Sequence, residues 1–176
     1  MDKKTLPAVD ILIIGASVAG TAAACGFSAR GLRTAIVERA QMCASEFADA
    51  LHTVGNTMAY RPSTQEGQAF ADELRQRDIL SDDGISLPAV APVISARLTA
   101  SGTTLYAPAC ITAISSSGKG YEVTFASMGG IFTISACAIV DTTASSSPLP
   151  GLTLQSLKPP ENTMPMPSER CLHPLM

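Results

Sequence analysis

The stretch ILIIGASVAGTAAACGF, residues 11–27, decides the fold predicted for this chain of 176 residues. It continues an apolar run that starts at Val9 and is rich in β-branched residues, which favours a strand buried on both faces of a parallel sheet. Gly15 ends that run, and residues 18–30 have the alanine-rich composition of a helix that stops at Gly31. Residues 32–37 are a second apolar run, so the unit predicts strand, helix and strand within about 30 residues.

Two other interpretations of this stretch are a membrane anchor and a secretion signal. Residues 11–29 carry no charge, which is close to the ~20 residues that a membrane span needs. Lys3 and Lys4 precede them, as in the basic end of a signal peptide. However, Asp10 adjoins the apolar run, and three glycines and three hydroxyl residues dilute its hydrophobicity. We therefore expect a cytoplasmic protein with no membrane partner.

The turn between the first strand and the helix has the features of a phosphate site. A diphosphate needs unobstructed N–H donors at a helix N-terminus, where the helix dipole also favours negative charge. Gly15 permits a tight turn and Gly20 a close approach of helix and strand, whereas Ser17 occupies the middle glycine position of G-x-G-x-x-G. Glu38, 23 residues after Gly15, is placed to accept hydrogen bonds from ribose hydroxyls. The alternative is a domain that uses these glycines only for packing.

Residues 10–40, DILIIGASVAGTAAACGFSARGLRTAIVERA, resemble the N-terminal FAD-binding segment of FAD-dependent oxidoreductases of the glutathione-reductase type. The resemblance implies an α/β fold: a Rossmann-like doubly wound parallel sheet with an inserted antiparallel β-meander. It implies FAD as the cofactor, with NAD or another adenine nucleotide as the alternative, and hydride transfer on the flavin itself. The implied cofactor-binding residues are Gly15, Ala16, Ser17, Val18, Ala19, Gly20, Glu38, Arg39, Ile111 and Thr143.

Later segments extend this prediction. The parallel sheet is expected from residues 9–14, 34–37, 104–107 and 138–141, and the meander includes strands at 121–125 and 131–134. Residues 64–80 predict an amphipathic helix, and residues 95–98 continue the helical layer. The resemblance places Ile111 beside the adenine. It also makes Asp-Thr-Thr-Ala, residues 141–144, the turn that closes over the cofactor, with Ala144 in place of a glycine.

Two regions are expected: a FAD/NAD(P)-binding domain at residues 1–147 and an irregular tail at 148–176 that contains seven prolines. Full-length members of the family carry a substrate domain and a late segment that returns to the flavin, and neither fits after Ala144. The chain is therefore predicted to be a truncated member that holds the ADP half of FAD. The alternative is a non-catalytic or degenerate nucleotide-binding module that docks on a partner chain or forms a homo-oligomer. A third hypothesis is a site for NAD or AMP without flavin.

Composition and the remaining polar residues exclude other classes of function. The net charge is −3 and Lys3-Lys4 is the only basic cluster, which argues against nucleic acid. Five cysteines without a C-x-x-C pair predict neither a disulfide framework nor a metal site, and Cys43 has no partner cysteine nearby in sequence. The segment around His52 resembles the His-Thr segment of succinate dehydrogenase flavoproteins but lacks their double glycine, so we expect an ordinary loop histidine. No catalytic residue is predicted.

Overall fold

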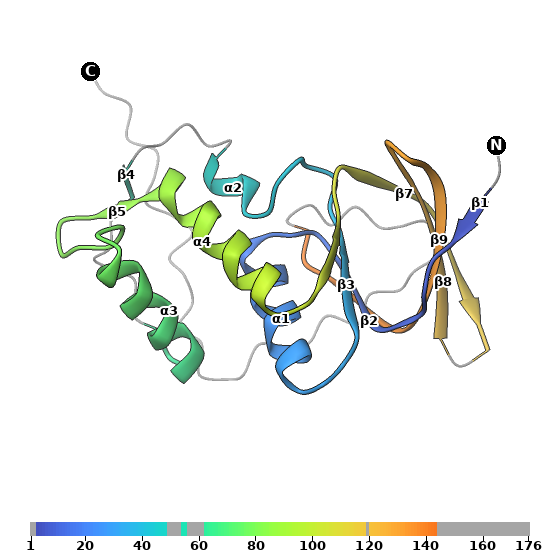
Figure 1. The fold of residues 1–176 in the computed structure, drawn as a ribbon, viewed down its shortest axis with the longest axis horizontal. Helices are drawn as coiled ribbons and strands as arrows, with labels where there is room; N and C mark the ends of the chain where they lie inside the picture. Colours follow the sequence, from blue (N-terminus) through green and yellow to red (C-terminus); the bar gives the residue numbers. More distant parts are fainter. Residues whose placement is uncertain (1–2, 49–53, 56–61, 119, 144–176) are drawn as a thin grey trace, which may run out of the picture.

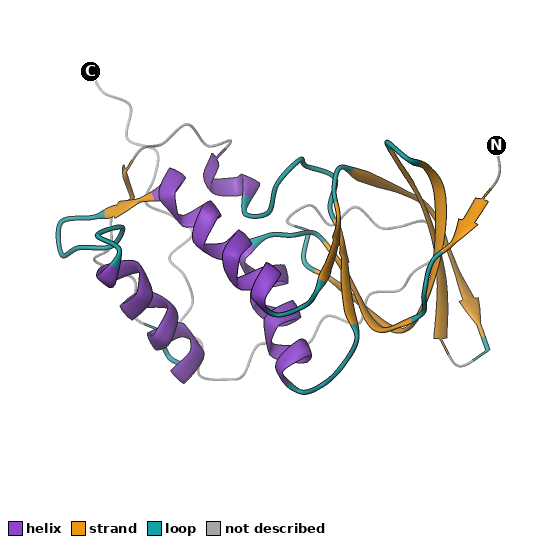
Figure 2. Ribbon diagram, viewed as in Figure 1, coloured by secondary structure: helices purple, strands orange, loops and turns teal. Residues whose placement is uncertain are grey.

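The computed structural model describes residues 3–48, 54–55, 62–118 and 120–143. This part of the chain contains nine strands and four helices, and Figures 1 and 2 show their arrangement. The strands are β1 (Lys3–Thr5), β2 (Val9–Ile14), β3 (Thr34–Val37), β4 (Val54–Gly55), β5 (Ile85–Ser86), β6 (Thr104–Tyr106), β7 (Ala109–Ser117), β8 (Gly120–Ser127) and β9 (Gly130–Asp141). The helices are α1 (Val18–Ala29), α2 (Ser45–Ala48), α3 (Gln65–Gln76) and α4 (Leu87–Ala100).

A seven-stranded sheet forms the centre of the fold. Its strand order is β6-β3-β2-β9-β8-β7, and β1 pairs with β9 off this path. β6, β3, β2 and the second half of β9 run parallel, whereas β7, β8 and the first half of β9 form an antiparallel meander. The predicted α/β fold, with its parallel sheet and inserted meander, is therefore confirmed.

Helices and meander cover opposite faces of the parallel strands (Figure 1). Ile13 and Ile36 lie in a core with residues of α1 and α4, such as Ala24 and Ile94. Leu12, Ala35 and Val37 point to the other face, where they pack with Phe125 and Ile134 of the meander. Alternate residues of a strand face opposite sides of a sheet, so both sides of β2 and β3 are buried. This double burial explains why these strands are continuous apolar runs in the sequence.

β9 corrects the prediction of two separate strands at residues 131–134 and 138–141. It is one strand of 12 residues. Its first half pairs with β8 and its second half with β2, and Ala136 pairs with both Tyr121 and Val9. Ser135 and Ala136 provide no glycine or proline that would end a strand between the two halves. β9 thus joins the meander to the parallel sheet, and β1 adds to its edge at a place where no strand was predicted.

The helical layer is partly as predicted. α3 begins after Thr64, whose hydroxyl accepts a hydrogen bond from the Gly67 amide, but it ends at Gln76 and is shorter than the predicted helix of residues 64–80. α4 is longer than the predicted residues 95–98. Pro88 lies in its first turn, where a helix needs no N–H donor. Pro92 lies inside α4, where five buried side chains on the same helix favour the helical path: Val90, Ala91, Val93, Ile94 and Leu98.

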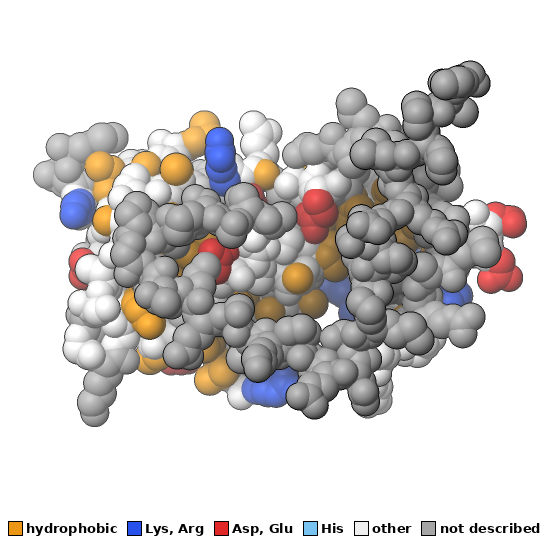
Figure 3. Space-filling model, turned by 180° about the vertical axis from the view of Figure 1, so that it is seen from behind, with side chains coloured by type: hydrophobic (Ala, Val, Ile, Leu, Met, Phe, Trp, Pro, Cys, Tyr) orange, Lys and Arg blue, Asp and Glu red, His pale blue; other side chains and the backbone are white. Residues whose placement is uncertain are grey.

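On the face that Figure 3 shows, the Lys and Arg side chains of the described residues lie apart from one another and form no continuous basic patch. Within residues 3–48, 54–55, 62–118 and 120–143, no helix combines the length and apolar character that crossing a bilayer needs.

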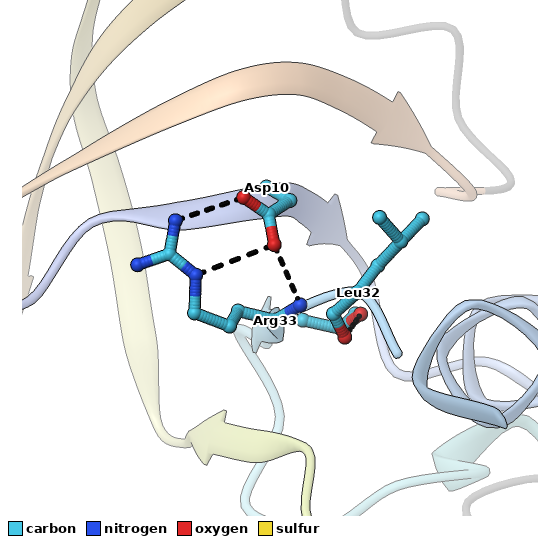
Figure 4. A network of polar contacts seen from close by, with 4 residues as sticks. Asp10, Leu32 and Arg33 are labelled. Atoms are coloured by element: carbon cyan, nitrogen blue, oxygen red, sulfur yellow. Dashed lines mark hydrogen bonds and ion pairs between the residues drawn. The ribbon is translucent and has the colours of Figure 1, made fainter. Parts of the chain in front are cut away.

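Asp10 and Arg33 form an ion pair where β2 and β3 begin, at the end of the sheet opposite to the carboxyl ends of these strands (Figure 4). Arg33 Nη2 lies 2.8 Å from Asp10 Oδ1, and the Arg33 amide donates to Asp10 Oδ2 at 2.8 Å. The hydrogen bonds from the Arg33 side chain and backbone lower the pKa of Asp10 below its ordinary value. The Asp10 carboxylate, which interrupts the N-terminal apolar run, therefore has a structural role.

We expect Asp10→Asn to lower the stability of the protein at neutral pH but not in acid. Because the pKa of Asp10 is lower in the folded than in the unfolded protein, its carboxylate contributes stability above the unfolded pKa. That contribution is lost as the pH falls through the folded pKa. Thermal unfolding midpoints of both chains, measured from neutral pH into acid, are expected to converge at low pH. Identical midpoints at neutral pH would contradict the prediction.

Candidate functional site

The carboxyl ends of the parallel strands meet at one edge of the sheet, and polar residues gather in the turns there. Gly15 follows β2, Glu38 follows β3 and Thr142 follows β9. β3 lies on one side of β2 and β9 on the other, so the chain reverses its direction of strand addition at this place. Open α/β sheets bind their ligands at such a switch point.

The turn from β2 into α1 needs glycine at two positions. Gly15 has a φ of +95°, a conformation that side chains disfavour, and its amide donates to the Val37 carbonyl at 2.9 Å. A Cβ atom at Gly20 would lie 2.5 Å from Thr142 Oγ1 and closer still to the carbonyl oxygen of Gly15. The backbone of α1 therefore touches the end of β2 directly.

Ser17 and Thr142 fasten this turn to the end of β9. Ser17 Oγ caps α1 by accepting a hydrogen bond from the Gly20 amide at 3.1 Å, and it lies 3.3 Å from Thr142 Oγ1. Thr142 Oγ1 in turn donates to the Gly15 carbonyl at 2.9 Å. The Thr142 amide donates to the Ile14 carbonyl at 2.9 Å. The Ser17 hydroxyl is thus engaged within the protein, and the turn is held from two sides.

Two amides of the turn are available to a ligand. Among the described residues, no acceptor takes the amides of Ser17 and Ala19. Both stand at the N-terminus of α1, a helix of 12 residues with no acidic residue in its own first turn. Free amides at the positive end of a helix dipole favour an anion.

Glu38 connects the turn to the loop after β3. Its Oε2 accepts a hydrogen bond from the Ala16 amide, and its Oε1 accepts from the Ala40 amide at 2.6 Å. The side chain is half-buried. Glu38 also lines the cavity beside the turn.

A cavity of about 180 Å³ lies between these turns and β7. It brings together five of the ten predicted site residues: Gly15, Glu38, Arg39, Ile111 and Thr143. The other five, Ala16, Ser17, Val18, Ala19 and Gly20, form the adjoining turn and the start of α1. The cavity therefore brings together segments from opposite ends of the described chain.

Sequence reasoning missed two residues of this edge, Thr142 and Glu46. Glu46 Oε1 accepts a hydrogen bond from the Val18 amide at 2.7 Å. The loop before α2 returns to the turn because the Ala44 amide donates to the Ala16 carbonyl at 2.7 Å. The spacing of residues in the sequence does not predict that this loop returns to the turn. Thr142 stands in the predicted turn at residues 141–144, but the sequence does not show which of two adjacent threonines faces the glycines.

The remaining predictions have different outcomes. Cys43 is 2% exposed, and its Sγ lies 2.9 Å from Ser95 Oγ in the helical core. His52, Ala144 and the tail at 148–176 lie outside the described residues. In the segments that the structure describes, no three His, Cys, Asp or Glu side chains are grouped so that they could hold a metal ion.

Comparison with protein families decides the relationship. A family model described as FAD dependent oxidoreductase matches residues 10–147. The chain belongs to this family. FAD is accordingly the cofactor of this family domain, and the resemblance inferred from residues 10–40 is confirmed. Comparison with curated protein sequences gives no significant match.

Solved structures share the fold of this domain. p-Nitrophenol 4-monooxygenase PnpA from Pseudomonas putida DLL-E4 matches with a TM-score of 0.61 and 14% identity, over 85% of this chain and 43% of that one. L-Proline dehydrogenase from P. horikoshii matches with a TM-score of 0.57 and 17% identity, over 81% and 24%. A flavoprotein/dehydrogenase from Cytophaga hutchinsonii matches with a TM-score of 0.56 and 19% identity, over 77% and 39%. At such identities the likeness shows the fold alone. The chain spans 24 to 43% of the length of these proteins.

The thiol of Cys110 provides a test of where FAD lies in this domain. Cys110 is exposed and lines the cavity with Glu38 and Ile111. We expect saturating FAD to slow alkylation of Cys110 at least about fivefold, because an adenosine bound in this cavity would cover the thiol. Cys137, which is also exposed and does not line the cavity, serves as the control within the same sample. Mass spectrometry of the alkylated peptides separates the two rates, and equal slowing of both thiols would contradict the prediction.

Proposed function

We propose that this domain binds the ADP half of FAD at the carboxyl edge of its sheet. In this proposal the diphosphate contacts the turn of residues 15–20, the ribose contacts Glu38, and the adenine lies beside Ile111. The observation that carries the proposal is a glycine turn with two available amides, which adjoins the cavity that Gly15 and the Glu38 carboxylate line. These groups fit the cofactor, because the amides suit an anionic diphosphate and the carboxylate suits hydroxyl donors.

Each residue of the proposed site has a defined part. Gly15 and Gly20 allow the backbone to come within reach of the diphosphate, since a side chain at either position would occupy strained or filled space. The amides of Ser17 and Ala19 donate to the diphosphate oxygens. Glu38 accepts from the ribose hydroxyls while it keeps the turn in place through Ala16. The flavin itself supplies the redox chemistry when bound, and the protein supplies binding and orientation.

The competing proposal is a non-catalytic module that docks on a partner chain or on a second copy of itself. The observation in its favour is Ser17 at the middle glycine position, because its hydroxyl is engaged within the protein. In this second proposal the fold of the site persists, but the site binds no FAD.

Titration of the purified chain separates these proposals. Calorimetry with FAD, NAD and AMP measures the three affinities, and an absorbance spectrum of the untreated protein reports any flavin that it carries. The proposed function predicts FAD binding tighter than that of NAD. A chain that binds none of the three ligands while folded by circular dichroism supports the non-catalytic module. Preference for NAD or AMP would overturn the FAD assignment.

A further inference from the structure

Glu46 places a second carboxylate at the N-terminus of α1. α1 has no acidic residue in its first turn, and Glu46 reaches it from α2, 28 positions away in sequence. Its Oε1 accepts from the Val18 amide at 2.7 Å, next to the available amides of Ser17 and Ala19. The contact satisfies an amide that the helix itself leaves without a partner.

Contacts on both sides of Glu46 fix the position of its backbone. The Ala44 amide donates to the Ala16 carbonyl, which ties the start of α2 to the glycine turn. Phe47 is half-buried and packs against the core formed by α1 and α4. Glu46 lies between these two anchors and is itself exposed to solvent.

Negative charge therefore accumulates where the proposed diphosphate binds. Glu38 and Glu46 both accept from amides of the same turn. Asp141 lines the adjoining cavity, where Arg39 is the only Lys or Arg among the described lining residues. A carboxylate and a diphosphate at the same helix N-terminus repel each other, and they compete for stabilisation by the same helix dipole.

We propose that Glu46 opposes the cofactor diphosphate at the N-terminus of α1 and so makes this a low-affinity, readily exchanged FAD site. The inference rests on the proposed function, because it concerns the same turn. Glu46 occupies the Val18 amide and contributes a like charge beside the incoming anion. The Glu38 carboxylate has a different role, because it lines the cavity in which the ribose hydroxyls are expected.

Glu46→Gln tests the charge alone. Glutamine keeps the length of the side chain and an oxygen that can accept from the Val18 amide, so the contact can persist without the negative charge. We expect Glu46→Gln to bind FAD and ADP about fivefold more tightly than the unaltered chain, from the loss of one like charge near the surface. Binding of adenosine, which has no phosphate, is expected to stay unchanged. Glu122→Gln on β8 makes the same change in net charge at an exposed position that lines none of the cavities at the site, and it is expected to have no effect.

Calorimetry of the three chains with FAD, ADP and adenosine distinguishes the outcomes, with circular dichroism to confirm folding. Tighter binding of FAD and ADP, but not of adenosine, supports the inference. Equal affinities in all chains would overturn it and leave the proposed function in place. Weaker binding by Glu46→Gln would also overturn it, because Glu46 would then help to hold the cofactor. If no chain binds FAD or ADP, the proposed function fails and the inference fails with it.

Discussion

Gly20→Ala is expected to abolish detectable FAD binding and to destabilise the protein. The added methyl group would lie 2.5 Å from Thr142 Oγ1 and even closer to the Gly15 carbonyl oxygen. The Gly15 oxygen belongs to the backbone at the end of β2, so no side-chain rotation relieves the overlap. α1 has to move away from the sheet, which carries the amides of Ser17 and Ala19 away from their present positions. Overpacking of this kind costs about 1–3 kcal/mol, and for a chain of this size about 3 kcal/mol corresponds to a fall in Tm of roughly 6–12 °C.

Gly26→Ala is the matched control for this experiment, because it adds the same methyl group to the same helix. A Cβ atom at Gly26 meets only Arg30 Nη1, at 3.4 Å, which is ordinary van der Waals contact. Alanine also has a higher helix propensity than glycine by about 1 kcal/mol. We therefore expect Gly26→Ala to keep the FAD affinity and to unfold at the same or a higher temperature. Similar losses in both variants would show that the close contact at Gly20 is not what the site depends on.

Glu38→Ala is expected to weaken FAD binding about 10- to 100-fold, since hydrogen bonds to charged groups contribute about 1.5–3 kcal/mol. The substitution removes the acceptor of the Ala16 amide and the acceptor of the Ala40 amide. In the proposed site it also removes the acceptor of the ribose hydroxyls. Calorimetry with FAD measures the loss, and Glu122→Ala on β8 provides the control for net charge.

A comparison of ADP with 2′-deoxy-ADP separates the role of Glu38 in ribose recognition from its role in holding the turn. The unaltered chain is expected to prefer ADP, because the carboxylate accepts from the 2′-hydroxyl. Glu38→Ala is expected to bind both ligands equally. If the variant keeps the preference for ADP while its affinity falls, Glu38 acts only through the turn and the ribose contact is wrong.

The parts of the fold that the sequence predicts are those with local signals. Gly15 ends an apolar run and Gly31 ends an alanine-rich one, so β2, α1 and β3 follow from neighbouring residues. The same holds for Glu38, because the end of β3 fixes its place at the carboxyl edge. Prediction is less successful where tertiary contacts decide. Pro92 argues against a helix locally, yet burial of one face of α4 outweighs that preference.

The parts of the site that the sequence does not reveal depend on how turns meet in space. Glu46 reaches the Val18 amide only because the Ala44 backbone, with a φ of +53°, returns the chain to the glycine turn. Thr142 faces the glycines because β9 is one continuous strand that ends there. Neither arrangement produces a pattern of residue spacing that could be recognised in a single sequence.

The central claim is that the N-terminal turn of α1 receives the cofactor diphosphate. Its most direct test is a ¹H–¹⁵N spectrum of the protein titrated with FAD. The account predicts that the amide resonances of Ser17 and Ala19 shift most as the ligand saturates, whereas that of Gly129, in the turn between β8 and β9, stays in place. Saturation by FAD with the Ser17 and Ala19 resonances unmoved would contradict the claim.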